Sequence, residues 1–308
     1  MLERRKFIKQ SAAAAAAGLL LSKSADAFFN TIKPMPPVGL QLFTFFGIID
    51  DDVQGTLKRI ADTGYKEIES AFSKKGGYYG MKAKEFKSLV EILGMQWKSH
   101  HVLGAPFKLP PGAKMPNDAN GKPLTIPPMR NLKDNMQELV AEVAEVGLPF
   151  LVCANTPINT TDDINSSLEV LNKTGEACKN AGVQFCDHNH DAEFKAVDGK
   201  IPYDLMLSQL DKNNVKFELD LAWATKGGAD PVALFNQNPG RFPLWHVKDL
   251  DASRENILPV GEGTIDFKRI FDAASIAGMK DFFVEHDMPK DAYASITTSI
   301  VNLKKLLS

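Results

Sequence analysis

The sequence predicts a single-domain (β/α)8 barrel, a TIM barrel, from three observations. Short apolar stretches alternate with longer amphipathic segments eight times between residues 38 and 307. Several apolar stretches end directly in charged or polar residues, as strands do at the ligand-facing rim of such a barrel. No glycine-rich phosphate loop follows the first stretch, which disfavours the alternative of an open doubly wound sheet.

The eight predicted strands are short and continuously apolar, as expected for parallel strands that are buried on both faces. In chain order they cover residues 38–44, 65–69, 95–99, 150–155, 183–186, 215–219, 242–247 and 282–285. The predicted helices carry apolar residues at helical spacing, and Gly94 and Gly182 are typical residues to follow a helix end. They cover residues 50–63, 82–93, 132–146, 162–181, 202–210, 231–235, 266–277 and 292–307.

The first residues predict a twin-arginine-type signal peptide over 1–27, which leaves 28–308 for the barrel. Arg4 and Arg5 precede an apolar run over 11–21 and an A-x-A cleavage site at 25–27. The run is too short and too rich in alanine to span a bilayer stably. We therefore expect a periplasmic protein with no stable membrane anchor after cleavage.

Charge and cysteine content narrow the class of partners. The net charge of the full chain is −2, and removal of residues 1–27 leaves about five negative charges net. An acidic chain without a basic cluster is not expected to bind nucleic acid. Three cysteines are too few, and odd in number, for a disulfide framework. We expect a small-molecule carbohydrate as the partner, and a homo-oligomer is left open.

A long proline-rich segment, residues 104–129, follows the third predicted strand. Its seven prolines are incompatible with regular structure. A loop of this length in a compact domain is typically a lid or a binding loop. It leaves the carboxyl end of a strand, so we expect it near the functional site.

Four successive predicted strands end in metal-ligating side chains: His188, Asp220, His246 and Glu285. The carboxyl ends of neighbouring parallel strands meet at one rim, so these residues form one predicted metal site. Two imidazoles and two carboxylates suit a transition-metal ion better than Ca²⁺. We expect one divalent ion, Mn²⁺ first, with Zn²⁺, Co²⁺, Fe²⁺ or Mg²⁺ as alternatives.

Further polar residues are predicted at the same rim, because all six histidines follow strands in this assignment. Glu285, His101 and Glu69 are the predicted catalytic residues, since imidazole and carboxylate groups are the usual general acids and bases. The predicted substrate-binding residues are His100, His190, Trp223, Lys248 and Phe43.

The chain resembles the xylose isomerase-like barrels, the family of sugar phosphate isomerases and epimerases that also includes inosose dehydratase and the AP endonuclease family 2 proteins. The resemblance rests on the stretches Gly39–Leu42, His188–Asp191, Glu218–Asp220, His246–Asp249, Gly261–Phe267 and on Glu285. It implies a divalent ion held at the ends of strands five to eight. Ketose 3-epimerases of this family place carboxylates at the fifth and eighth strands. Here Glu285 matches the second, whereas His188 replaces the first.

Three functions follow from this pattern. The first is a metal-dependent isomerase or epimerase that removes a proton next to a sugar or polyol carbonyl, with a metal-stabilised enediolate. The second is a lyase that expels a β-substituent from the same intermediate, for example from a 3-keto-glycoside. The third is a periplasmic carbohydrate-binding protein without turnover. The sequence does not separate the first two, because they share every residue named above.

Overall fold

The computed structural model describes residues 37–107 and 129–307. The predicted signal peptide lies outside the described residues, as does most of the predicted lid loop. Both remain predictions. Within 37–308, which forms one compact unit, the structure confirms the predicted fold.

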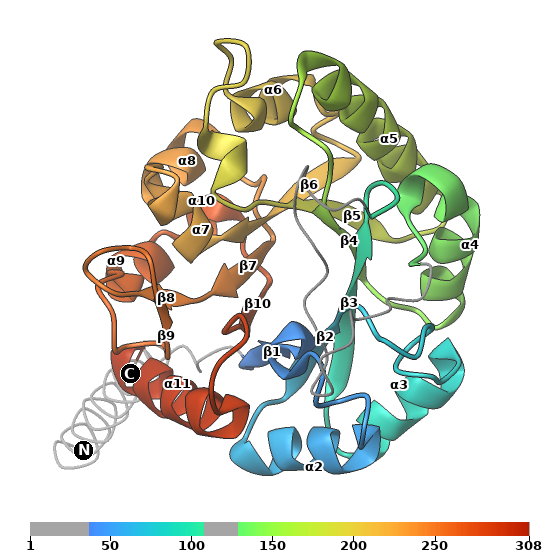
Figure 1. Cartoon of the computed structure of the whole chain (residues 1–308), viewed down its shortest axis with the longest axis vertical. Coiled ribbons are helices and arrows are strands. Elements are labelled where there is room, and N and C mark those ends of the chain that lie inside the picture. The colour runs from blue at the N-terminus through green and yellow to red at the C-terminus, as the bar shows by residue number, and fades with distance from the viewer. Residues whose placement is uncertain (1–36, 108–128, 308) are drawn as a thin grey trace, which may run out of the picture. The chain divides into compact units, whose positions relative to one another are not determined.

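Eight parallel strands close into a barrel in the order β1-β10-β7-β6-β5-β4-β3-β2 (Figure 1). Each strand pairs in parallel with its neighbours, and β1 closes the circle against β10 through Gly39 and Leu40. The barrel strands are β1 Gly39–Gln41, β2 Glu67–Ser70, β3 Gln96–Leu103, β4 Phe150–Asn155, β5 Gln184–His188, β6 Val215–Asp220, β7 Leu244–Val247 and β10 Asp281–Val284.

Helices connect successive strands and form an outer ring around the barrel (Figure 1). Several begin with a side chain that accepts a hydrogen bond from the first turn, such as Asp52 at α2 and Thr160 at α5. The helices are α2 Val53–Thr63, α3 Ala83–Ile92, α4 Leu132–Glu145, α5 Thr161–Asn180, α6 Pro202–Gln209, α7 Leu221–Lys226, α8 Pro231–Gln237, α9 Phe267–Asp272, α10 Ala274–Ala277 and α11 Ala292–Leu306, with short 3-10 turns η1 Leu42–Phe45 and η2 Ala192–Phe194.

The first and third strands differ most in length from the prediction. The first is shorter, because the Gln41 side chain accepts a hydrogen bond from the Phe43 backbone N–H and begins η1. The third is longer and runs to Leu103, so His100 and His101 lie within it rather than beyond its end. Its pairing with both neighbours shifts register, and such bulges redirect side chains next to functional sites.

The connections after β6 and β7 contain helices and strands that were not predicted from the sequence. Helix α7 follows β6 directly, and the predicted helix over 266–277 is interrupted at Ala273. After β7 a small antiparallel hairpin forms from β8 Asp249–Leu250 and β9 Ile257–Leu258. The Asp249 carboxylate holds the following loop by accepting hydrogen bonds from the backbone of Gly261, Gly263 and Ile265.

Strand alternation divides the barrel interior into layers. An apolar cluster near the amino ends of the strands contains Phe150, Val152, Cys186, Leu244 and Phe283. Residues two positions later on a strand point to the same side and lie about 6–7 Å nearer the carboxyl end. The polar side chains that follow these core residues therefore enter the same interior above an apolar floor.

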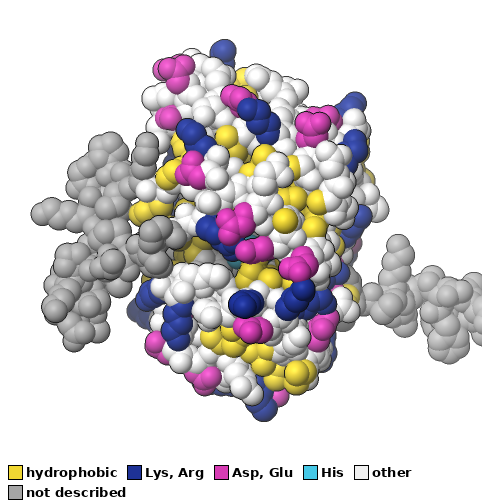
Figure 2. All heavy atoms as spheres, turned by 90° about the vertical axis from the view of Figure 1, so that its right-hand side faces the viewer, with side chains coloured by type: hydrophobic (Ala, Val, Ile, Leu, Met, Phe, Trp, Pro, Cys, Tyr) yellow, Lys and Arg dark blue, Asp and Glu magenta, His cyan; other side chains and the backbone are white. Residues whose placement is uncertain are grey.

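The outer helices carry charges of both signs. Figure 2 shows acidic and basic side chains interspersed over one face of the molecule. Some are paired, as in the ion pairs of Lys84 with Glu145 and of Lys173 with Glu169. Among the helices of the described residues, none is long and apolar enough to cross a membrane.

We expect Gly39→Ala to destabilise the barrel. A Cβ at this position would lie 2.5 Å from a ring carbon of Phe283 and 2.7 Å from the Phe282 carbonyl oxygen. Overpacking of this kind costs roughly 1–3 kcal/mol, more than alanine gains by restricting the unfolded chain. Urea unfolding measures the difference, and an unchanged free energy of unfolding would show that the β1–β10 junction relaxes freely.

Candidate functional site

The structure brings the four predicted metal ligands together at the carboxyl ends of β5, β6, β7 and β10. His188, Asp220, His246 and Glu285 each direct one ligand atom into a group whose members all lie within 4.8 Å of one another. All four side chains are buried. His188 and Asp220 end their strands, His246 lies within β7, and Glu285 follows β10. This arrangement could hold a metal ion.

Local hydrogen bonds fix the position of Asp220. Its Oδ1 accepts a hydrogen bond of 2.8 Å from the Trp223 backbone N–H and so caps α7. The Asn189 side chain accepts from the backbone N–H of Asp220 and donates to its carbonyl oxygen. Asp220 is thus a helix cap through one oxygen, and Oδ2 remains directed into the site.

Hydrogen bonds also orient the two imidazole rings. The Nδ1 atom of His188 lies 3.2 Å from the Ala154 carbonyl oxygen, an acceptor that requires Nδ1 to carry the hydrogen. The Nε2 atom of His246 lies 2.6 Å from Glu69 Oε1. The remaining nitrogens, Nε2 of His188 and Nδ1 of His246, face each other at 3.0 Å. Two lone pairs at this distance repel unless a proton or a metal ion lies between them.

The carboxylate oxygens at this point fit a divalent ion. Asp220 Oδ2 and Glu285 Oε2 are buried and accept no hydrogen bond of good geometry. Asp220 Oδ2 lies 3.6 Å from Nε2 of His188, and Glu285 Oε2 lies 2.7 Å from Nδ1 of His246. Two neutral nitrogens and two anionic oxygens are a donor set that transition-metal ions bind at about 2.0–2.2 Å.

The electrostatic environment keeps the ligands in the protonation states that a metal needs, with one exception. Burial opposes ionisation of Asp220 and Glu285, but the Lys248 ammonium outweighs it and lowers both pKa values, that of Asp220 to about 2. Burial lowers the pKa of His188 well below its usual range, so this ring is neutral. Burial also disfavours charge on His246, yet Glu218 and Glu285 raise its pKa, so a metal ion would displace a proton there.

A second buried group lies around the other nitrogen of His246. It consists of Glu69, His101 and Glu218, and it offers four ligand atoms together with His246. Nε2 of His101 lies 2.6 Å from Glu218 and 3.1 Å from Glu69. Burial disfavours charge on His101, but these two carboxylates raise its pKa to about 9. Hydrogen bonds hold the group together, although Glu218 Oε1 is buried without a partner, so the group positions His246 and holds a proton.

Glu69 is the best-anchored member of this group. Besides His246 and His101, it contacts the Gln41 side chain at 2.6 Å and accepts a hydrogen bond from Ser99. These contacts suit Glu69 to positioning the rings of His246 and His101 rather than to the catalytic role predicted from the sequence. Sequence reasoning assigned no role to Glu218, although the spacing of Glu218 and Asp220 signals that both point to the same side of β6.

Lys248 lies directly beside the four-residue group. Its Nζ atom is 3.0 Å from Asp220 Oδ2, 2.9 Å from Glu285 Oε2 and 2.8 Å from Asp287 Oδ2. The side chain is buried, and the three carboxylates outweigh burial and raise its pKa. Asp287 was also missed by sequence reasoning, although it stands two residues after Glu285 and so on the same side of the chain.

Two predicted substrate-binding residues lie next to the site. The His190 ring is 4.9 Å from that of His188, and Trp223 is 5.9 Å from His190. The indole N–H of Trp223 is buried without a hydrogen-bond partner, and Lys248 Nζ lies 5.5 Å from its ring. Phe43, in η1, instead stacks on the ring of Phe46, which follows η1; the two ring centroids are 5.2 Å apart. His286 contacts Ser295 on α11 at 2.8 Å.

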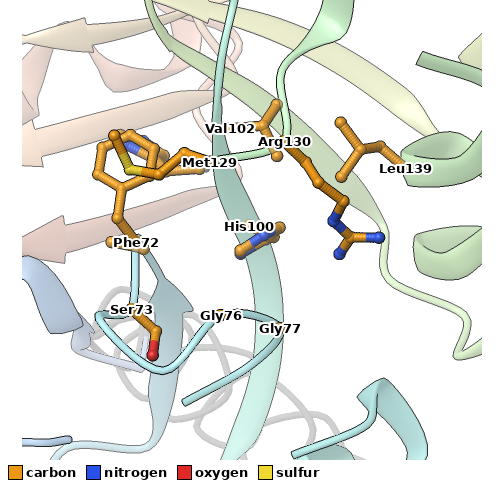
Figure 3. A pocket seen from close by; sticks show the side chains of 11 residues that line it. Phe72, Ser73, Gly76, Gly77, His100, Val102, Met129, Arg130 and Leu139 are labelled. Carbon is orange, nitrogen blue, oxygen red and sulfur yellow. The ribbon is translucent and has the colours of Figure 1, made fainter. Parts of the chain in front are cut away.

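His100 points to the other side of β3 from His101. Its Nδ1 lies 2.8 Å from Ser70 Oγ, and its ring packs on Tyr78. It lines a small pocket of about 70 Å³ beside the strands, together with Phe72, Met129 and Arg130 (Figure 3). His101 lines the same pocket, so the pocket and the second buried group adjoin at this residue.

The sequence matches a family model described as xylose isomerase-like TIM barrel over residues 57–303, and the chain belongs to this family. A sugar phosphate isomerase/epimerase of Parabacteroides distasonis has a similar structure, with 27% identity and a TM-score of 0.70. The comparison covers 90% of this chain and 97% of that one.

Two further comparisons concern chemistry. An inosose dehydratase of Geobacillus thermodenitrificans is 24% identical over 145 residues, 42% of this chain and about half (48%) of that relative. The structure of the IOLI protein with a bound zinc atom has a TM-score of 0.63 at 15% identity, over 88% of this chain and 98% of that one. The second likeness shows the fold alone. The structural and sequence neighbours of the chain thus include a sugar phosphate isomerase/epimerase and an inosose dehydratase.

We expect His101 to make the stability of the metal-free protein fall between pH 6.5 and 9. Its pKa is about 9 in the folded protein, against an unperturbed value near 6.5. A raised pKa adds stability that is complete below pH 6.5 and is lost as the pH rises through 9. The loss is on the order of 2–3 kcal/mol.

Urea unfolding in the presence of a chelator, at several pH values from 6 to 9, measures this loss. His101→Gln should reduce it, and the remaining slope should come from other groups whose pKa is raised, among them His246 and Asp187. The control is His286→Gln, because burial lowers the pKa of that residue and it does not titrate in this window. An identical slope in His101→Gln would contradict the assigned pKa.

Proposed function

We propose that the protein is a divalent-metal-dependent isomerase or epimerase that acts on an unphosphorylated sugar or polyol. One observation carries the proposal: Nε2 of His188 and Nδ1 of His246 face each other at 3.0 Å, beside two carboxylate oxygens that lack hydrogen bonds. Such a buried set is costly unless cations complete it; Lys248 contacts the two oxygens alone, whereas a metal ion would bind the nitrogens as well. The family and the similarity to a sugar phosphate isomerase/epimerase support the same activity.

A divalent ion in this site would act as a Lewis acid on a substrate carbonyl and stabilise an enediolate. The chain's own groups supply proton transfer and orientation. Glu285 is the proposed base, since Lys248 and His246 lower its pKa and keep it ionised. His101 holds a proton between Glu69 and Glu218 and is the proposed second acid. Lys248 and the free indole N–H of Trp223 are the proposed donors to substrate oxygens.

Among residues 37–107 and 129–307, no arginine near the site is free of ion pairs, which favours a substrate without a phosphate. Arg130 is the described arginine that lines the neighbouring pocket. Its guanidinium donates to both carboxylate oxygens of Glu142, at 2.7 and 2.8 Å, and also to Glu138. A phosphate would have to replace these ion pairs, whereas neutral hydroxyl groups would not.

A metal-dependent lyase is the second candidate, and the similarity to inosose dehydratase favours it. Loss of a β-substituent starts from the same enediolate and needs the same base. The neighbouring pocket could receive the departing group, because it adjoins the proton-holding group at His101. A 3-keto-glycoside is the substrate class that this candidate names.

We expect the purified protein to bind one equivalent of a divalent ion. Glu285→Gln and His188→Ala should each weaken binding of Mn²⁺ or Zn²⁺ by at least about tenfold, because each removes one ligand. His286→Ala is the matched control, since its ring contacts Ser295 rather than the site. Calorimetric titration and metal analysis measure the binding. A content below about a tenth of an equivalent that does not rise on adding metal would refute the metal centre.

We expect turnover to exchange a carbon-bound hydrogen of the substrate with solvent. In deuterated water, incubation with a 3-keto-glycoside should give either rearranged sugar with the aglycone attached, or free aglycone. The first product supports the isomerase and the second the lyase. Glu285→Gln should abolish exchange in either case, because the base is lost. Binding of the sugar without any exchange in the wild type would instead show a non-catalytic binding protein.

A further inference from the structure

The ammonium group of Lys248 contacts the same two oxygens that the proposed metal ion would use. Nζ lies 3.0 Å from Asp220 Oδ2 and 2.9 Å from Glu285 Oε2. These are the carboxylate atoms that face Nε2 of His188 and Nδ1 of His246. An ion bound at about 2.1 Å from Glu285 Oε2 would therefore lie within about 5 Å of Nζ.

We propose that Lys248 is the resident counter-cation of the metal-free site and that it competes with the metal ion for Asp220 and Glu285. This inference rests on the proposed metal centre. Two buried carboxylates without a cation would repel each other and lose their hydration. The ammonium supplies the missing positive charge, so the site keeps its shape when no metal is bound. The same charge opposes a divalent ion, since both lie in a buried region where charges interact strongly.

Asp287 gives the ammonium a partner that is not a metal ligand. Its Oδ2 lies 2.8 Å from Nζ, the shortest of the three contacts. The Asp287 side chain is 22% exposed, whereas that of Lys248 is 2% exposed. When a metal ion binds Asp220 and Glu285, Lys248 can remain paired with Asp287. Lys248 thereby sets the affinity and the exchange of the metal, in addition to any contact with substrate.

The contacts define two variants with different charge. Lys248→Met keeps the length of the side chain and removes the competing cation, but it also leaves the group of three carboxylates with one more net negative charge. The double variant Lys248→Met, Asp287→Asn removes one charge of each sign and so preserves the net charge of the wild type. It separates direct competition for the two oxygens from a general electrostatic effect.

Calorimetric titration of chelator-treated protein with Mn²⁺ tests the inference. We expect the dissociation constant to fall at least about tenfold in Lys248→Met, and to stay clearly below the wild-type value in the double variant. Lys226→Met is the matched control. Lys226 Nζ also lies 5.5 Å from the Trp223 ring, but its partner is Glu255, which is 71% exposed. Its dissociation constant should equal that of the wild type.

Thermal unfolding gives a second readout and covers the case in which Lys248→Met folds poorly without metal. The metal-free variant should unfold at a lower temperature than the wild type, because its carboxylates have lost their counter-cation. Saturating Mn²⁺ should raise the unfolding temperature by more in the variant than in the wild type. The double variant should show a smaller loss without metal, since one carboxylate fewer repels Asp220 and Glu285.

The outcomes distinguish this inference from the proposed function. If the wild type binds Mn²⁺, and both Lys248 variants bind it with unchanged or weaker affinity, the competition is overturned and the metal centre stays intact. Tighter binding in the single variant alone shows a general charge effect and also overturns it. Binding by the variants but not by the wild type supports the competition and refutes the metal centre as a property of the wild-type protein. Binding by no variant overturns both.

Discussion

The hydrogen bond between Nε2 of His246 and Glu69 is the interaction on which the site depends. This contact is 2.6 Å long and fully buried. It determines that Nδ1 of His246 faces His188, Asp220 and Glu285. Gln41 and Ser99 hold Glu69 in turn, so strands β1, β2, β3 and β7 all contribute to the orientation of one imidazole. The site is therefore a property of the closed barrel, because β7 does not pair with β1, β2 or β3 and its imidazole meets their side chains across the barrel interior.

Strand alternation explains why charged residues accumulate in the barrel interior. On β7, Leu244 belongs to the apolar layer, His246 to the middle layer, and Lys248 follows on the same side two residues later. On β10, Phe283 belongs to the apolar layer, and Glu285 and Asp287 follow the end of the strand and contact Lys248. Each strand thus changes from core to site within two residues, and the apolar floor keeps water away from the charges above it. Ion pairs buried in this manner are strong and also costly to leave incomplete.

The fold and the meeting of the four proposed metal ligands were predictable from the sequence because both follow local rules. Eight apolar stretches predicted the strands, and the polar residue at the end of each predicted the rim. The second buried group, Glu69, His101 and Glu218, was harder to predict from the sequence. Glu218 and Glu69 acquire their roles only through contacts between β2, β3 and β6. His100 and His101 illustrate the same limit. They are neighbours in sequence, but the strand continues through them, so only His101 faces the barrel interior.

The histidine at the fifth strand changes the charge that the proposed metal ion would experience. In the ketose 3-epimerase arrangement implied by the resemblance, carboxylates stand at the fifth and eighth strands. Here His188 is neutral, so the four ligands carry only the two negative charges of Asp220 and Glu285, which balance a divalent ion. An ion bound by fewer carboxylates keeps more of its positive charge and polarises a carbonyl more strongly. The replacement of a carboxylate by His188 also removes one possible base. The buried ammonium of Lys248 adds positive charge beside the same oxygens, and both features favour stabilisation of an anionic intermediate over a second proton transfer by a metal-bound carboxylate. That balance suits elimination as well as isomerisation, since departure of a substituent requires one base and a stabilised anion.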